Sequence, residues 1–326
     1  MYTIGVDLGG TNIAIGLCDE ELKMIDKGSV PTRAQRDPKC IIADMAALAK
    51  QIIERNSLSL SDIEYVGIAS PGSANSETGI IEYANNLPFS NFPIAEIFKS
   101  YLPVKNVYIA NDANAATLAE YLVGSSKGSN VSVMITLGTG VGGGVIMNGK
   151  IFDGGINCSG TELGHTVIVA GGRQCSCGRR GCWEAYSSAT ALSAMTREKM
   201  NELKLKGVKS LLFDISEKDG GNVSARTAFN AMKRGDAWGR EIVDNYIGYL
   251  AEGITNMINI FQPDVLSIGG GICNEKEYLT KPLIEIVNRD QYTRANAKKT
   301  KIVTATLGND AGIIGAAGLG RQFREK

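Results

Sequence analysis

A compact group of metal-binding residue types lies near the middle of the chain. Cys175, Cys177 and Cys182 follow His165, which is the only histidine in the sequence. Three thiolates and one imidazole complete a tetrahedral zinc site with no open position, an arrangement typical of structural zinc. Two glycines between the cysteines allow tight turns. The alternative is that these cysteines are incidental or redox-active, but the segment lacks the Cys-x-x-Cys pair of redox proteins.

Two glycine-rich turns carry the residue types that bind phosphate. The first is Asp7-Leu-Gly-Gly-Thr11 and the second begins at Gly138. Glycines let backbone N–H groups approach an anion closely, and a threonine adds a hydroxyl donor. Asp7 could orient Mg²⁺ through water, because this ion keeps much of its hydration shell. An ordinary glycine hairpin is the alternative interpretation.

The second turn also contains Gly-x-Gly-x-x-Gly, from Gly138 to Gly143. A dinucleotide-binding loop must pass from a strand into a helix, whereas residues 145–151 continue as a strand and hairpin. Residues 144–150 likewise fit Gly-x4-Gly-Lys, but Ile151 occupies the place of the required Ser or Thr. Both matches are therefore chance.

Asn111 and Asp112 stand where a strand gives way to a helix. Such a position suits a residue that faces a cleft. It equally suits a helix N-cap, which Asp fills well. The local sequence leaves both interpretations open.

Alternating strand and helix patterns surround these residues and predict an α/β fold. The predicted strands cover 2–8, 13–18, 24–30, 64–69, 106–110, two strands within 131–151, and 265–268. The predicted helices cover 38–55, 112–123, 185–206, 225–234, 236–261 and 310–320. The hairpin around the first glycine turn recurs around the second, which indicates an internal duplication. We expect two domains, residues 1–124 and 125–326, that meet near a Gly/Ser-rich segment.

Composition excludes several classes of function. Lys plus Arg and Asp plus Glu both number 34, so no global charge attracts nucleic acid. The sequence contains no run of about 18 apolar residues, so it predicts no membrane span. The first residues lack a signal-peptide pattern. The four remaining cysteines are scattered, as suits free thiols in a reducing compartment. We therefore expect a cytoplasmic protein.

The two turns, followed by glycines at 269–271, resemble the actin-like ATPase and sugar-kinase superfamily over nearly the whole chain. The resemblance implies duplicated actin-like (ribonuclease H-like) domains around a central nucleotide and sugar cleft. It also implies that ATP and catalytic Mg²⁺ bind here. The expected nucleotide-binding residues are Asp7, Gly9, Gly10, Thr11, Asn12, Gly138, Thr139, Gly140, Gly270 and Gly271.

The metal-binding segment is similar to the signature of the ROK family (repressors, open reading frames and kinases). Glu162-Leu-Gly-His165 precedes Cys175-Ser-Cys-Gly-Arg-Arg-Gly-Cys-Trp-Glu184. The resemblance implies that His165 binds structural Zn²⁺ through one ring nitrogen and a sugar hydroxyl through the other. It implies that Glu162 and Glu184 accept hydrogen bonds from further hydroxyls.

Asn111-Asp-Ala-Asn-Ala115 matches the catalytic segment of that family. The resemblance implies that Asp112 accepts the proton of the attacking sugar hydroxyl and that Asn111 fixes a neighbouring hydroxyl. Gly72 and Asn86 fall where the family closes its sugar pocket. The chain departs from the family at Thr161, which replaces a usual glycine, and at residues 89–92, which lack a tryptophan that many members carry.

These features predict an ATP-dependent hexose 6-kinase, with glucose as the first candidate substrate. Fructose, mannose, allose, N-acetylglucosamine and N-acetylmannosamine stay open, because carboxylates specify a polyol and not its epimer. A sugar-sensing repressor would need a DNA-binding helix-turn-helix ahead of the first strand, which begins at residue 2. An actin-like assembly protein would have little use for the sugar and zinc residues. By resemblance we expect a homodimer or higher homo-oligomer, with no nucleic-acid or membrane partner.

Overall fold

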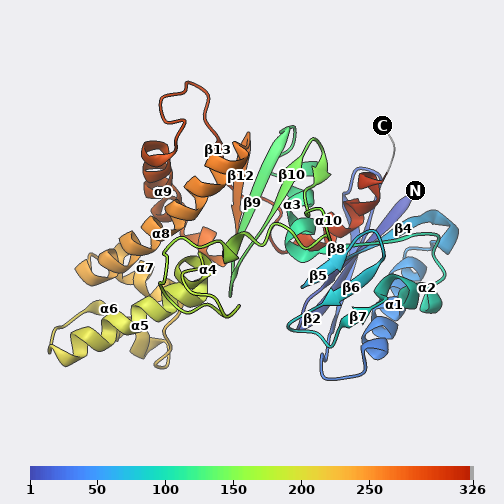
Figure 1. Cartoon of the computed structure of the whole chain (residues 1–326). Coiled ribbons are helices and arrows are strands. Elements are labelled where there is room, and N and C mark those ends of the chain that lie inside the picture. Colours follow the sequence, from blue (N-terminus) through green and yellow to red (C-terminus); the bar gives the residue numbers. More distant parts are fainter. Residues whose placement is uncertain (324–326) are drawn as a thin grey trace. The chain divides into compact units, whose positions relative to one another are not determined.

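The computed structural model describes residues 1–323, which form two compact units (Figure 1). Unit 1 contains Met1–Ser132, Gly144–Thr161 and the chain from Ala305 onward, and unit 2 contains Val133–Gly143 and Glu162–Thr304. The units are thus interleaved along the chain. The single boundary expected after residue 124 stays a prediction, and the last three residues of the expected second domain lie outside the described part.

A five-stranded sheet forms the centre of unit 1, in the order β3-β2-β1-β4-β8. Its strands are β1 (Tyr2–Leu8), β2 (Asn12–Cys18), β3 (Met24–Pro31), β4 (Ile63–Ser70) and β8 (Val107–Asn111). The first three strands pair antiparallel, and β1, β4 and β8 run parallel. Leu8 pairs with Ile13, which leaves the first glycine turn at the end of a hairpin.

The two faces of β1 meet different helices because side chains alternate along a strand. Ile4 and Val6 are buried in a core with residues of α1 (Pro38–Arg55) and α2 (Ile94–Tyr101). On the opposite face, a Cβ at Gly5 would lie 2.0 Å from the Ile313 carbonyl oxygen of α10 (Ala311–Gly318). A helix of small residues can therefore pack directly on the sheet, and it also contacts α3 (Asp112–Leu122).

The second sheet has the order β11-β10-β9-β12-β13, which matches the order of the first. Its strands are β9 (Val131–Leu137), β10 (Val141–Met147), β11 (Lys150–Ile151), β12 (Val265–Gly269) and β13 (Lys301–Thr304). The second glycine turn joins β9 to β10, as the first joins β1 to β2. Two sheets of one topology agree with the predicted duplication. Residues 145–151 form the end of β10, a turn and β11, as predicted. No helix follows the second glycine turn directly, so the turn is not a dinucleotide-binding loop.

Unit 2 also contains six helices within the described chain: α4 (Glu184–Ser187), α5 (Ala189–Leu205), α6 (Leu211–Lys218), α7 (Ala225–Lys233), α8 (Ala237–Phe261) and α9 (Glu277–Asp290). The helix predicted over 185–206 is interrupted at Ser188, whose hydroxyl accepts from the Ala191 N–H and caps α5. Helix α8 ends where Gln262 adopts a left-handed conformation before Pro263.

Several elements have no counterpart in the sequence prediction, namely α2, α6, α9, β13 and a small sheet of β5 (Ser73–Asn75), β6 (Ile80–Tyr83) and β7 (Ser90–Phe92). Within residues 1–323, no helix combines the length and apolar character that a membrane crossing needs.

Candidate active site

The predicted zinc ligands lie together in unit 2. One ligand atom from each of His165, Cys175, Cys177 and Cys182 can be chosen so that all lie within 4.8 Å of one another. Cys177 Sγ and Cys182 Sγ are 3.7 Å apart, and His165 Nδ1 is 3.6 Å from Cys175 Sγ. A tetrahedral zinc ion with usual bond lengths separates two sulfurs by about 3.8 Å and a sulfur and nitrogen by about 3.6 Å. The cluster could therefore hold zinc.

Glycines shape the loop that carries these ligands. Gly178 and Gly181 have φ angles of 89° and 86°, in the region that favours glycine. A Cβ at Gly181 would also lie 1.8 Å from the Val169 carbonyl oxygen. The prediction that these glycines permit tight turns is confirmed. We refer to residues 165–182 as the Cys/His loop.

Glu184 connects the Cys/His loop to the second glycine turn. Its Oε1 accepts a hydrogen bond of 2.9 Å from Ser176 Oγ, between two of the cysteines, and its Oε2 accepts one of 3.1 Å from the Val141 N–H. A Cβ at Gly140 would lie 2.3 Å from Oε2, so the turn passes directly over this carboxylate. The predicted contact of Glu184 with a sugar stays a prediction. The bonds to Ser176 and Val141 were not foreseen.

The second glycine turn is held by the segment that follows Glu184. The Ala189 N–H donates to the Gly138 carbonyl at 2.9 Å, and Thr190 Oγ1 donates to the Thr139 carbonyl at 2.8 Å. With both carbonyls engaged, the turn keeps a fixed shape while the Thr139 side chain is exposed. This is a suitable arrangement for binding an anion.

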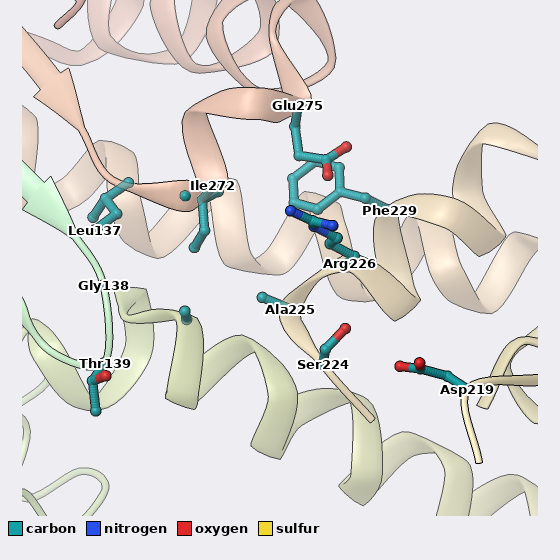
Figure 2. A pocket seen from close by; sticks show the side chains of 12 residues that line it. Leu137, Gly138, Thr139, Asp219, Ser224, Ala225, Arg226, Phe229, Ile272 and Glu275 are labelled. Carbon is teal, nitrogen blue, oxygen red and sulfur yellow. The ribbon is translucent and has the colours of Figure 1, made fainter. Parts of the chain in front are cut away.

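A cavity of about 430 Å³ adjoins this turn within unit 2 (Figure 2). Gly138 and Thr139 line one end of it, and Gly271, Ile272 and Phe229 line other parts. Gly270 has a φ angle of 96°, and a Cβ there would lie 2.1 Å from the Leu137 carbonyl oxygen. Gly270 therefore lets the chain pass close to β9, while Gly271 lines the cavity. A cavity with both apolar and polar walls, beside a turn suited to an anion, has the character of a nucleotide pocket.

Other residues lining this cavity had no signal in the sequence. Ser224, Ala225, Arg226 and Phe229 lie at and within the start of α7, and Glu275 lies just before α9. Neither segment carries a recognisable motif.

The first glycine turn lies in unit 1. The Gly9 N–H donates to the Asn12 carbonyl at 2.9 Å, and Thr32 Oγ1 donates to the Gly9 carbonyl at 2.7 Å. The side chains of Thr11 and Asn12 are exposed. Gly10 lies close to Asn86, since a Cβ at Gly10 would be 3.3 Å from the Asn86 Cβ. The structure thus brings a predicted nucleotide residue and a predicted sugar residue together.

Asn111, and not Asp112, caps helix α3. Asn111 Oδ1 accepts from the N–H groups of Ala113 and Asn114 at 2.9 and 3.3 Å. Its Nδ2 donates to the Gly72 carbonyl at 3.1 Å, which joins two of the predicted sugar residues. A Cβ at Gly72 would lie 2.0 Å from the Tyr83 carbonyl oxygen, so this position requires glycine.

Asp112 and Asp7 form a pair of interacting carboxylates in unit 1. Burial raises the pKa of Asp112, although the N–H of Ala113 opposes the change. Burial raises the pKa of Asp7 to about 6, with a further contribution from the negative charge of Asp112. Such a pair of carboxylates could bind a cation or accept a proton.

Thr161 and Glu162 precede the Cys/His loop. Thr161 has a φ angle of 64°, in the region that favours glycine, and its hydroxyl donates to Asn114 Oδ1 at 3.2 Å. The carbonyl of Glu162 accepts from the His165 N–H at 3.0 Å across a short 3₁₀ turn. Glu162 therefore belongs to the same local structure as the histidine.

Two duplicated sheets, two glycine turns and a Cys/His loop define the chain as an actin-like protein of the kind that contains sugar kinases. The model of the ROK family matches residues 3–322, and the chain belongs to this family. It is 36% identical to a glucokinase of Thermotoga maritima over 97% of this chain and 96% of the relative, and 34% identical to a glucokinase of Halalkalibacterium halodurans over 98% and 95%. The fold is similar to that of a ROK family glucokinase from Streptomyces griseus in complex with glucose and AMPPNP, with a TM-score of 0.79 and 28% identity over 99% of this chain and 100% of that one.

Proposed function

We propose that this protein is an ATP-dependent hexose kinase that phosphorylates glucose at its 6-hydroxyl. The observation that carries the proposal is the pair formed by Asp7 on β1 and Asp112 at the start of α3, in a chain related to glucokinases along nearly its whole length. A carboxylate with a raised pKa is a stronger base than ordinary aspartate, which suits the removal of a hydroxyl proton.

In this proposal Asp112 receives the proton of the sugar hydroxyl as that oxygen bonds to the γ-phosphorus of ATP. The bond from that phosphorus to the bridging oxygen breaks, and ADP leaves with the electron pair. Asn111, fixed by its cap and by Gly72, orients a neighbouring hydroxyl. Backbone N–H groups of the two glycine turns and the hydroxyls of Thr11 and Thr139 bind phosphate oxygens, which is how phosphoryl transfer is mainly assisted.

The pocket beside the second glycine turn is the proposed site of the adenosine. Its size and the apolar side chains of Leu137, Phe229 and Ile272 suit a purine, and Thr139 lies at its end, where the phosphates would leave it. Asp7 is the proposed residue for Mg²⁺, held through water, which would neutralise charge on the phosphates.

We also propose that the Cys/His cluster holds structural zinc. His165 Nδ1 faces the sulfur of Cys175, so its Nε2 is the nitrogen left for a sugar hydroxyl. Glu162 and Glu184 are the proposed acceptors for other hydroxyls. In this assignment zinc makes the loop rigid. Glu184 links the loop to the second glycine turn through its hydrogen bonds with Ser176 and Val141.

ADP release measured with Mg²⁺·ATP across a panel of sugars tests the proposal. The panel contains glucose, mannose, fructose, allose, N-acetylglucosamine and N-acetylmannosamine, and we expect the highest kcat/KM with glucose. Asp112→Asn should lower kcat by about 10²- to 10⁴-fold. Asp244→Asn, an exposed substitution on α8, is the matched control and should change nothing.

The outcomes separate substrate from reaction. A different preferred hexose would correct the substrate alone. Absence of ADP release with every sugar, or near-normal turnover of Asp112→Asn, would reject the kinase. We further propose a cytoplasmic homodimer or higher homo-oligomer, on family resemblance, and sedimentation velocity would measure its assembly.

A further inference from the structure

Glu275 places a buried carboxylate in the wall of the cavity. Only 7% of its surface is exposed, and it lies at the end of a 3₁₀ turn, Gly271–Glu275, that leads into α9. Of the other polar side chains that line the cavity, Thr139, Asp219 and Arg226 are exposed and Ser224 caps α7. Glu275 is therefore the buried charge of this pocket.

Lys233 forms an ion pair with the Glu275 carboxylate. The ammonium group at the end of α7 donates to Glu275 Oε2, and it also lies 5.0 Å from the centre of the Tyr278 ring. A buried carboxylate without such a partner would be costly and would tend to take up a proton. The pair thus holds a negative charge at a fixed place.

The other oxygen of Glu275 is available to a ligand. No residue in the described part of the chain donates a hydrogen bond to Oε1. Figure 2 shows the carboxylate on the same side of the cavity as Arg226 and the ring of Phe229, and across from Gly138 and Thr139. A molecule whose phosphates lie at Thr139 would extend its base toward this region.

We propose that Glu275 selects the base of the phosphoryl donor, by accepting a hydrogen bond from the 6-amino group of adenine at Oε1. An ionised carboxylate only accepts hydrogen bonds. The 6-oxo group of hypoxanthine or guanine also only accepts, so the two would repel each other across the pocket. The inference rests on the proposed kinase function and names the residue that would confine the donor to adenine nucleotides.

Inosine nucleotides test this directly, because inosine and adenosine share the same ribose and differ at the 6 position. The measurements are the dissociation constants of ADP and IDP by calorimetry, and kcat/KM for ATP and ITP. The wild type should prefer the adenine nucleotide by about tenfold or more, as a hydrogen bond to a charged group predicts. Glu275→Gln should reduce this preference to within about threefold, because an amide can donate as well as accept. Glu277→Gln, an exposed neighbour, should retain the full preference.

Other results would overturn the inference. If Glu275 bound the ribose, Glu275→Gln would weaken ADP and IDP equally. If Arg226 paired with Glu275 when nucleotide binds, the substitution would leave the preference unchanged. Should Glu275→Gln not fold, Glu275→Asp retains the charge opposite Lys233 but shortens its reach, and an unchanged preference in that variant would equally reject the idea.

The binding measurement also separates this inference from the kinase proposal. Equal affinity for ADP and IDP in an active kinase would reject the role of Glu275 alone. A clear adenine preference with no sugar phosphorylated would reject the kinase and leave base selection standing.

Discussion

Replacing Asp7 with asparagine should stabilise the folded chain while removing a group that the proposed kinase needs. The pKa of Asp7 is about 6 in the folded chain, against 3.8 for an ordinary aspartate, because of burial and the charge of Asp112. Folded Asp7 therefore holds its proton more tightly than unfolded Asp7. Folding takes up a proton between about pH 4 and pH 6, so stability from this residue is lost as pH rises through that window.

The magnitude follows from the same two values. One pKa unit corresponds to about 1.4 kcal/mol, so ionised Asp7 costs at most about 3 kcal/mol at pH 7.5. At pH 5.0 the folded chain keeps Asp7 mostly protonated and the unfolded chain does not, and the cost falls to roughly half of that value. The Asp7→Asn substitution introduces a neutral side chain of the same shape. It should raise the free energy of unfolding by these amounts relative to wild type.

Urea unfolding followed by circular dichroism, without nucleotide or Mg²⁺, measures the gain at both pH values. Effects of pH on the zinc ligands are common to both proteins and cancel in the difference between them. Asp244→Asn is the control for loss of a surface carboxylate and should change stability by less than about 0.5 kcal/mol at either pH. Equal gains at pH 7.5 and pH 5.0, or no gain at all, would refute the account of Asp7.

Substitutions at three further positions follow from particular contacts. In Gly312→Ala the new Cβ would lie 2.5 Å from Asp7 Oδ2, so kcat should fall at least about tenfold while circular dichroism stays native. Glu120 is fully buried, and its carboxylate accepts from the backbone N–H groups of Ser125, Thr306 and Leu307. Glu120→Ala should cost about 3 kcal/mol or more by urea unfolding, with Glu120→Gln costing less. Cys182→Ser should reduce bound zinc, measured by mass spectrometry, and lower Tm; a normal Tm in protein shown to lack zinc would contradict a structural role.

The sequence predicted the parts of the site whose residues lie close together along the chain. The Cys/His cluster and both glycine turns fall within short segments, where residue type and spacing alone restrict the geometry. The nucleotide pocket could not be predicted in this way. Leu137, Phe229 and Glu275 come from three separate segments, and only folding brings α7 and the 3₁₀ turn before α9 to the end of β9.

Glu184 illustrates a second limit. Its place in the family signature predicted a sugar contact, which stays a prediction. In the structure its carboxylate accepts a hydrogen bond from the N–H of Val141, 43 residues away along the chain. Nothing near Glu184 in the sequence points to that partner. Thr161 shows the reverse case: its departure from glycine was visible in the sequence, but only its φ angle of 64° shows which property of glycine the position uses.

The sequence left Asn111 and Asp112 between a helix cap and a catalytic role. In the structure Asn111 is the cap, and the catalytic role is the one that we propose for Asp112. Asn111 supplies the cap, so the Asp112 side chain is not needed for it. Asp112 is then the first residue of α3, where the helix dipole favours its ionised form while burial disfavours it. These opposing influences suit a group that must be ionised to accept a proton and must hold it once accepted. The cap and the proposed base are therefore compatible, because the cap fixes the strand-to-helix junction from which the Asp112 side chain extends.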